Sequence, residues 1–358
     1  MTDTAAPALD PRLTQALNTT VNTVGALLLA ALLFGTFLLL AGYDPLAVYA
    51  LLWKGAFGSA FAWQNTLQRA APLMLTALCV ALPARAGLIV IGGEGAVLMG
   101  GLAAAALGAS LSGFAGAGAL LPMALAGALA GGLWIGLVGL LRERRGVNEA
   151  IGSLLMAYIA AALFNHLVEG PLRDPASLNK PSTPTLPEAL RLGELPGIDV
   201  HGGLAIGVLA CVLAHILIHH TPWGFSLKVA GGNPRAGRLV GLPVGGLAIA
   251  ACVLGGAAAG LAGMVEVAAV HGSANSALAA GYGYAGILVA FVARQQPLAI
   301  LPTALLVGGI AAAGGLLQRR LGLPDATVNV LQGFLFLSIL VAEPLFARLN
   351  QLRRSIQR

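Results

Sequence analysis

The sequence predicts an all-α, polytopic membrane protein. Of its 358 residues, 58% are hydrophobic and only 9% are Asp, Glu, Lys or Arg, whereas soluble domains carry about 25% charged residues. Its 49 glycines are roughly twice the usual share, and glycine is more frequent in membrane helices than in soluble ones. This composition excludes a disordered chain and a collagen-like repeat. Three cysteines inside apolar runs exclude a disulfide scaffold.

Ten apolar stretches are candidate membrane spans, since a spanning helix needs about 20 mostly apolar residues. They cover residues 21–42, 64–83, 87–108, 117–141, 150–168, 203–220, 246–270, 284–294, 297–317 and 326–346. The eighth is short, and the glycine-rich residues 281–286 are a candidate re-entrant turn. We therefore expect about ten transmembrane helices, with eight or nine as alternatives.

The basic residues predict the orientation of these spans. Placing the N-terminus inside and alternating ten spans puts 13 of the 20 Lys and Arg residues on the inner face. The positive-inside rule therefore favours N-in and C-in, with Arg319 and Arg320 as the main exceptions. We expect cytoplasmic tails at 1–20 and 347–358 around a transmembrane domain at 21–346, and no cleavable signal. The net charge of +6 then reflects the membrane and not nucleic-acid binding.

Two features are expected on the outer side. Tyr49, Trp53, Phe57 and Phe61 recur every four residues, so on one helix they would form an aromatic stripe lying in the outer interface. Residues 169–202 contain six prolines and form the long external loop of this arrangement.

The sequence contains no motif for nucleotide hydrolysis, metal binding or covalent catalysis. A Walker motif needs glycine directly before lysine, and the three lysines follow Trp53, Asn179 and Leu227. His215 and His219 have the spacing of two ligands, but a zinc site needs three or four. The GxGxxG match at 281–286 opens a membrane helix and does not follow a strand, as dinucleotide binding requires. We expect no enzyme, no metal and no resident cofactor.

The inner loop 221–245 contains a short helix with a signal at each end. Asn233 suits the N-cap and Pro234 the first helical position, while Gly241 suits the residue after the last turn. A capped helix of about two turns between two spans indicates a docking surface. The alternative is a plain connector carrying positive-inside arginines.

The run from Gly232 to Leu242 resembles the coupling loop of ABC importer permeases of the branched-chain amino acid, ribose and nucleoside type. Other stretches agree in order and spacing, namely Ile-Gly-Gly-Glu-Gly at 91–95, Gly-Val-Asn-Glu at 146–149, and Gly-Tyr-Gly-Tyr-Ala-Gly-Ile at 281–287. The signatures around Glu94, Asn148-Glu149 and residues 263–267 most resemble the nucleoside (simple sugar) branch.

The resemblance implies a multi-pass permease of the bacterial inner membrane that moves a nucleoside or simple sugar. It implies a second permease subunit in a heterodimer, two cytoplasmic ABC ATPases that bind ATP, and an external substrate-binding lipoprotein. The implied ATPase-coupling residues are Gly232, Asn233, Pro234, Arg235, Arg238 and Gly241.

Glu94 is the most informative acid within the predicted spans, because a buried charge there indicates a pathway or a paired interior site. Its glycine neighbours permit a broken helix, so Glu94 either lines the pathway or braces a half-helix. Asn148 and Glu149 fit a helix start, and Tyr158 either faces the conduit or packs. The pathway candidates are Glu94, Gly92, Gly93, Gly95, Asn148, Glu149 and Tyr158. Glu266 and Glu343 are expected at the interfaces.

Three other functions stay open at this point. A self-sufficient secondary transporter would depend on an ion gradient, although most spans lack the charges that such carriers use. An ABC permease for branched-chain amino acids would share the motifs quoted above. A membrane-embedded enzyme ranks third, since no catalytic cluster is found.

Overall fold

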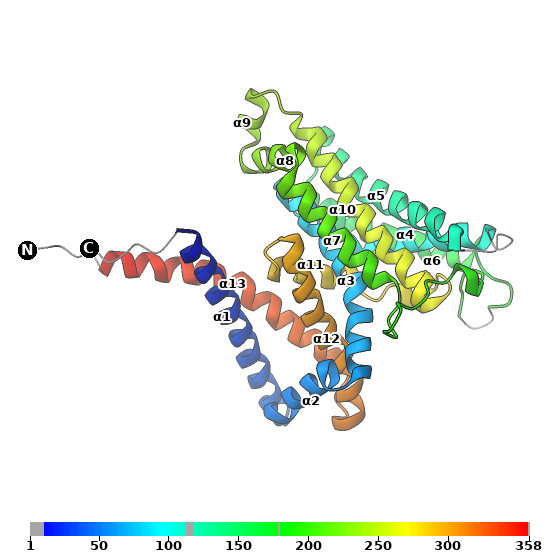
Figure 1. Ribbon diagram of the computed structural model, residues 1–358, viewed down its shortest axis with the longest axis horizontal. Coiled ribbons are helices and arrows are strands. Elements are labelled where there is room, and N and C mark those ends of the chain that lie inside the picture. Colours follow the sequence, from blue (N-terminus) through cyan, green and yellow to red (C-terminus); the bar gives the residue numbers. More distant parts are fainter. Residues whose placement is uncertain (1–10, 112–116, 178–179, 357–358) are drawn as a thin grey trace, which may run out of the picture. The chain divides into compact units, whose positions relative to one another are not determined.

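The computed structural model describes residues 11–111, 117–177 and 180–356, and the side chains of 11–21, 117 and 342–356 lie outside the description. The described chain is almost entirely helical (Figure 1). The helices are α1 (Pro11–Leu40), α2 (Pro45–Phe57), α3 (Ala60–Arg85), α4 (Gly93–Ser110), α5 (Leu120–Arg145), α6 (Glu149–Glu169), α7 (Gly203–His220), α8 (Pro222–Gly232), α9 (Pro234–Leu239), α10 (Val244–Val265), α11 (Tyr282–Val292), α12 (Pro297–Leu321) and α13 (Ala326–Ile356). Short elements are η1 (Ala117–Ala119), η2 (Glu188–Leu190), the π-helix η3 (Glu266–His271) and η4 (Ser276–Leu278).

The all-α, polytopic fold is confirmed. Among the described residues, eight helices are long and apolar enough to cross a membrane, and three shorter apolar helices cover Pro45–Phe57, Ser276–Val292 and Ala326–Val341. The last two overlap the expected eighth and tenth spans. The expected third span began at 87, whereas the helix begins at Gly93, because residues 88–92 are not helical.

Two compact units make up the chain. The first contains the residues up to Leu51 and those from Leu317 onward, and the second contains Leu52–Leu316. In the first unit α1 packs on α13, where the rings of Phe37 and Phe334 lie 6.2 Å apart. The residues of interest below all belong to the second unit.

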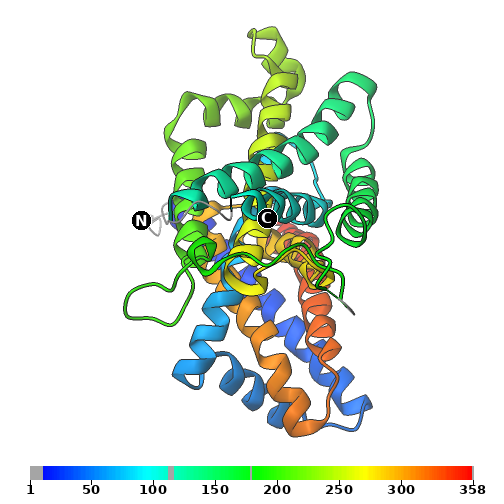
Figure 2. The same cartoon turned by 90° about the vertical axis from the view of Figure 1, so that its right-hand side faces the viewer.

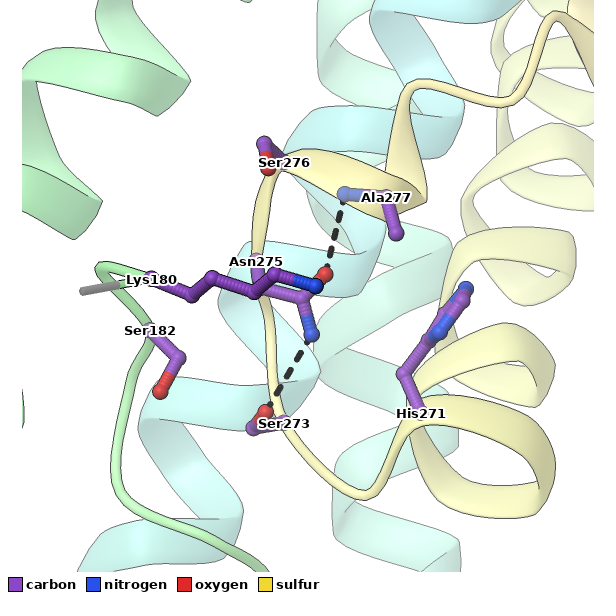
Figure 3. Close-up of a pocket in the computed structure, with 7 residues that line it drawn as sticks. All are labelled: Lys180, Ser182, His271, Ser273, Asn275, Ser276 and Ala277. Carbon is purple, nitrogen blue, oxygen red and sulfur yellow. Dashed lines mark hydrogen bonds between the residues drawn. The ribbon is translucent and has the colours of Figure 1, made fainter. Parts of the chain in front are cut away.

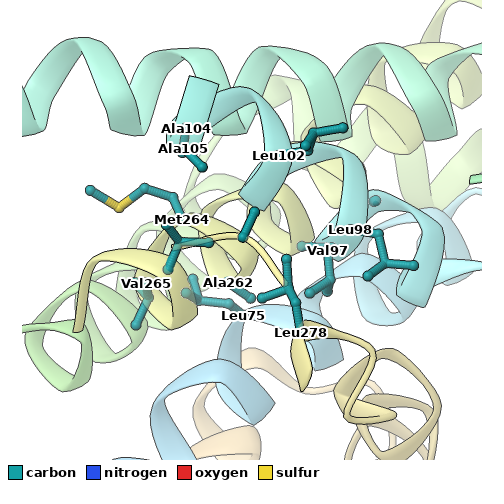
Figure 4. Packing of buried hydrophobic residues seen from close by; sticks show 14 of the residues in the cluster. Leu75, Val97, Leu98, Leu102, Ala104, Ala105, Ala262, Met264, Val265 and Leu278 are labelled. Carbon is teal, nitrogen blue, oxygen red and sulfur yellow. The ribbon is translucent and has the colours of Figure 1, made fainter. Parts of the chain in front are cut away.

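Glycines bring the central helices of the second unit into backbone contact. A Cβ atom on Gly260 of α10 would lie 2.1 Å from the carbonyl oxygen of Gly127 in α5, and one on Gly263 would lie 2.0 Å from that of Val97 in α4. Small residues at helix interfaces are a general feature of membrane bundles. The glycine excess therefore serves close packing around α10, beside a buried apolar cluster (Figure 4) that includes Leu75, Leu98, Leu102, Met264 and Leu278.

The expected single aromatic stripe is wrong. Helix α2 ends at Phe57, and Phe61 belongs to α3. The break occurs because the Ser59 hydroxyl accepts a hydrogen bond from the amide of Ala62, 3.1 Å away, and so caps a new helix. The spacing of four continues through residues that do not share one helix.

The loop at 170–202 packs along η3 and the segment that follows it (Figure 2). The amides of Thr183, Leu186 and Leu192 donate to the carbonyls of Ala274, Gly272 and Ala268 at 3.0, 2.7 and 2.9 Å. Leu186 and Leu190 are buried. These contacts make the loop a fixed cover over this end of the second unit.

Candidate functional site

Two helices of the second unit meet at their N-termini. Helix α4 begins at Gly93 after the non-helical residues 88–92, and α11 begins at Tyr282 after Gly281, whose φ of +82° favours glycine. A Cβ atom on Gly283 would lie 2.0 Å from the amide nitrogen of Glu94. The backbones of the two helix starts are therefore in contact, and Gly283 leaves no room for a side chain between them.

The Glu94 carboxylate occupies this junction. It is buried, with 5% of its surface exposed. Its Oε1 accepts a hydrogen bond from the amide of Gly281 at 2.9 Å, and its Oε2 accepts one from Gly283 at 2.6 Å. Free amides and the positive end of the dipole at a helix N-terminus stabilise a negative charge. Glu94 thus braces the start of α11, which is one of its two expected roles; lining of the pathway stays a prediction.

Helix α6 supports the non-helical segment in front of α4. The amide of Ile89 donates to Glu149 Oε1 at 3.3 Å, and the amide of Ile91 donates to Ser153 Oγ at 3.0 Å. Glu149 also forms an ion pair with Arg142. Irregular backbone in an apolar region must have its polar groups satisfied, and these two side chains of α6 do so.

Asn148 and Gly95 shape the helices that form this site. The Asn148 side chain accepts hydrogen bonds from the amides of Ala150 and Ile151 at 3.0 and 3.1 Å, so it caps α6. A Cβ atom on Gly95 would lie 2.9 Å from Cα of Ala157. Gly95 therefore lets α4 approach α6 closely.

Tyr158 is not packed, contrary to one of its expected alternatives. Its side chain on α6 is 62% exposed in this chain, and Tyr284 on α11 is 41% exposed. The two phenols lie within electrostatic range of each other. The structure therefore groups Gly92, Gly93, Glu94 and Glu149 around the junction and places Tyr158 on an open face.

Replacing Gly92 with alanine is expected to destabilise the protein. The added Cβ would lie 2.0 Å from the carbonyl oxygen of Ser153, and backbone cannot yield as a flexible side chain can. We expect a loss of about 1–3 kcal/mol of unfolding free energy, seen as a lower unfolding temperature of the detergent-purified protein. Gly333→Ala in α13 is the control, because no heavy atom lies within 4 Å of its added Cβ. Equal melting of both variants would contradict the prediction.

The short helix of the inner loop is present with its expected ends. The Asn233 side chain accepts hydrogen bonds from the amides of Arg235 and Ala236, both at 3.1 Å, and Pro234 is the first residue of α9. Gly241 has φ +81°, and the amide of Leu242 donates to the carbonyl of Gly237. These contacts confirm the predicted caps.

The same loop contains a second helix that we did not predict. Thr221 caps α8 through the amide of Gly224, at 3.2 Å. Leu227 and Ala230 of α8 pack on Val244 and Ala251 of α10. Helices α8 and α9 lie together at one end of α7 and α10 (Figure 1).

The outward surface of α9 is both basic and apolar. Its exposed side chains are Pro234, Arg235, Arg238 and Leu239, followed by exposed Val240. Leu239 is 88% exposed. Gly232 is exposed too, whereas Gly237 is buried against α8 and α10. This surface is therefore free within the chain to contact a partner.

Sequence reasoning missed a polar cluster at the other end of the unit. Glu266 was expected at an interface, yet it is buried at the start of η3, and its Oε2 lies 3.5 Å from Nε2 of His271. His201 is also buried, with no hydrogen-bond partner for its ring nitrogens within the described structure. The sequence signal that could have indicated this cluster is an acidic residue, Glu266, followed five residues later by a histidine, His271. Glu343 lies outside the described side chains.

A polar cavity of about 300 Å³ adjoins this cluster (Figure 3). Its lining residues are Lys180, Ser182, His271, Ser273, Asn275, Ser276 and Ala277. Asn275 holds its own loop, because its side-chain oxygen accepts a hydrogen bond from the amide of Ala277 at 2.9 Å. Within the described ranges, no group of three or more His, Cys, Asp or Glu side chains could hold a metal ion.

The end of the second unit that contains His201 is expected to become less stable in acid. Burial lowers the pKa of His201 below its usual 6.5, although the nearby Glu266 carboxylate partly opposes this effect. The unfolded chain then binds a proton below pH 6.5 that the folded chain does not, so unfolding becomes easier as pH falls from 6.5 toward the folded pKa. Thermal unfolding between pH 5 and 8 should show this slope. The slope should weaken in His201→Gln and persist in His166→Gln, an exposed histidine; an unchanged slope in His201→Gln would contradict the prediction.

Comparisons with known proteins identify the family. The family described as "Branched-chain amino acid transport system / permease component" matches residues 62–340. The glucose ABC transporter permease protein TsgB13 of Haloferax volcanii is 33% identical over 348 residues, covering 94% of this chain and 91% of the relative. The guanosine ABC transporter permease protein NupP of Bacillus subtilis is 30% identical, covering 84% and 87%. The nucleoside ABC transporter permease protein NupB of Lactococcus lactis is 27% identical, covering 86% and 87%.

These matches identify the class of transporter, while the transported solute stays a prediction. ABC permeases operate with separate ATPase and substrate-binding protein partners, and ATP is used by the ATPases. The family match covers well over half of the chain, and two of these relatives are at least 30% identical along most of its length. The chain therefore belongs to the branched-chain amino acid transport system permease family and is a transmembrane permease subunit of an ABC importer, not an enzyme.

Proposed function

We propose that this permease moves a nucleoside or a simple sugar. The observation that carries the proposal is that relatives covering most of the chain are named as glucose, guanosine and nucleoside permeases. The site is compatible with an uncharged solute. The Glu94 carboxylate is already bound by two backbone amides, so it is committed to the start of α11 and is not left to bind the charged group of an ion or an amino acid.

The proposed pathway passes the junction of α4 and α11. Gly92, Gly93 and Glu94 would border its narrow part at this junction, where all three are buried in the described structure. Asn148 and Glu149 would support this part from α6.

Two exposed tyrosines extend the proposed pathway beyond the junction. Tyr158 and Tyr284 expose ring faces on which a nucleobase or the apolar face of a sugar can stack. Gly95 would hold α4 and α6 at the spacing that places Tyr158 beside the junction.

In the proposed transport cycle an external binding protein delivers solute to the outer mouth. Closure of the ATPases on ATP moves the coupling residues Gly232, Asn233, Pro234, Arg235, Arg238 and Gly241. That movement switches the half-helices at the junction between outward and inward access.

The proposed cycle also requires further subunits and a defined orientation of the chain in the membrane. We propose a second permease subunit, in a heterodimer, and two ATPases on the face formed by residues 221–245. The chain would lie in the bacterial inner membrane with both termini inside. The tails 1–20 and 347–358 would be cytoplasmic, residues 21–346 the transmembrane domain, and residues 169–202 external.

Uptake by the assembled transporter tests the substrate class. The permease is co-expressed with candidate ATPase, second-permease and substrate-binding lipoprotein genes from the same genome, and uptake of radiolabelled glucose, guanosine, uridine and leucine is measured. We expect saturable uptake of one sugar or nucleoside, which unlabelled solute of the same class competes away. Uptake of leucine alone would favour the branched-chain amino acid alternative and contradict the proposal.

The energy source is tested in the same cells. Uptake should stop when ATP is depleted, because the chain itself carries no ATP-binding motif and depends on its partners. It should continue when an uncoupler collapses the ion gradient while ATP is maintained. The reverse pattern would indicate a secondary transporter.

A further inference from the structure

Helix α11 is bound at both ends by side chains from one short stretch of chain, residues 85–94. At one end of this stretch, Glu94 accepts hydrogen bonds from the amides at the N-terminus of α11. At the other end, Nη2 of Arg85 donates to the carbonyl oxygen of Gln295, 3.0 Å away and just beyond the C-terminus of α11. A helix dipole favours an anion at the N-terminus and a cation at the C-terminus, and α11 has both.

We propose that Arg85 is a positioning residue that passes movement of α8 and α9 to α11, so that α11 and residues 85–94 move as one body. This inference rests on the proposed ATP-driven cycle, and it adds the route by which the movement reaches the junction. The route has three contacts, all within the second unit.

The first contact joins α9 to α8. Gly237 of α9 is buried, and a Cβ atom there would lie 3.6 Å from Cα of Ala230 and 3.0 Å from a methyl group of Val244. Ala230 belongs to the small apolar core shared by α8 and α10, against which Ala86 also packs. A displacement of α9 therefore acts directly on α8.

The second contact joins α8 to the end of α3. A Cβ atom on Gly231 would lie 2.2 Å from the carbonyl oxygen of Arg85 and 2.9 Å from the carbonyl carbon of Ala86. The chain then turns at Gly87, whose φ is +75°. Backbone touches backbone here, so no side chain can change rotamer and absorb the displacement.

The third contact is the Arg85 side chain itself. Its guanidinium is half-buried, its Nε has no hydrogen-bond partner among the described atoms, and no described carboxylate pairs with it. A cation serving only the positive-inside rule would be solvated. This one is withdrawn from solvent and directed at the Gln295 carbonyl.

The turn that receives Arg85 has an unfavourable backbone. Arg294 and Gln295 have φ of 49° and 58° without being glycines, a conformation that costs free energy and persists only when surrounding contacts enforce it. The amide of Gln295 donates to the carbonyl of Ala290 at 2.8 Å. The carbonyl of Gln295 is thereby held toward Arg85 and tied to the last turn of α11.

The test measures movement of α11 without reference to substrate. Tyr284→Cys places a reactive thiol on an exposed position of α11, while the three native cysteines are buried. Maleimide labelling is timed in the transporter assembled with its ATPases, with and without ATP plus vanadate. We expect nucleotide to change the labelling rate several-fold in this background.

Three substitutions in this background separate the possible roles of Arg85. Arg85→Gln should abolish the response to nucleotide while ATPase co-purification and unfolding temperature stay unchanged. Arg85→Lys should restore part of the response, because an ammonium group can donate to the same carbonyl. Arg294→Gln removes an exposed cation from the same turn and should leave the response intact.

Three results overturn the inference and leave the proposed function standing. The first is a full response in Arg85→Gln, and the second is a loss in Arg85→Gln that is matched by Arg294→Gln. The third is ATP-dependent uptake by the Tyr284→Cys transporter itself with no labelling response to nucleotide. A native transporter without ATP-dependent uptake overturns the proposed function, and this inference with it.

Discussion

Glu94→Gln is expected to reduce uptake by at least tenfold while the chain still inserts into the membrane. The carboxylate accepts one backbone hydrogen bond on each oxygen. Glutamine keeps one acceptor and turns an NH₂ donor toward the other amide. A hydrogen bond to a charged group contributes about 1.5–3 kcal/mol, so the start of α11 loses one of its two attachments and the attraction between the charge and the helix dipole.

The kinetics of Glu94→Gln distinguish its two expected roles. Bracing predicts a lower maximal rate and a lower unfolding temperature with little change in the apparent affinity for solute. Lining predicts a weaker apparent affinity. Glu188→Gln in the loop at 170–202 is the matched control, because its carboxyl group is exposed and distant in sequence from the junction. Wild-type uptake in Glu94→Gln would refute both roles.

Deleting residues 233–240 is expected to abolish both uptake and co-purification of the ATPases. This segment forms α9 and its flanks, and most of its side chains are exposed. Its removal therefore exposes little of the core around α10, and the protein should still be inserted and folded. Uptake, ATPase pull-down and unfolding temperature measured together check the prediction, and retained uptake would contradict it.

Point substitutions distinguish what the exposed charges of α9 contribute to ATPase binding from what its helical structure contributes. The pair Arg235→Glu and Arg238→Glu reverses two exposed charges without touching the caps, and should weaken ATPase binding strongly. Asn233→Ala removes the N-cap at a cost of about 1 kcal/mol to the helix and should weaken binding less. Reversal of Arg144 and Arg145, exposed at the end of α5, controls for a general loss of positive charge. Equal effects of the two reversals would argue against docking on α9.

Sequence reasoning succeeds here where structure depends on near neighbours. In the caps of α9 and α6, the side-chain oxygens of Asn233 and Asn148 accept hydrogen bonds from amides two and three residues further along the chain, so a short stretch of sequence suffices to predict them. The membrane class follows from composition. The apolar runs locate the long helices, although about ten spans are expected and eight helices of the described residues are long and apolar enough to cross a membrane. The irregular backbone before Glu94 follows from a cluster of glycines around a charge.

Sequence reasoning fails where a contact joins residues that are far apart along the chain. The partners of Glu94 lie 187 and 189 residues further along the chain, and the carbonyl bound by Arg85 lies 210 residues away. No local pattern encodes such pairs. Glu266 has the same explanation, since its burial depends on how η3 is covered by the loop at 170–202. The prediction of a single aromatic stripe was wrong because the four-residue spacing of the aromatic residues does not reveal that Ser59 caps a new helix.

The contact between α10 and its neighbours constrains what can move during transport. Where two helices meet through side chains, rotamer changes provide a deformable layer that lets them slide or tilt. At Gly260 and Gly263 that layer is absent, because the backbones of α5 and α4 lie where a Cβ would be. Beyond the junction, α4, α5 and α10 therefore form a rigid block of helices. Movement during transport must be sought in the segments outside this block.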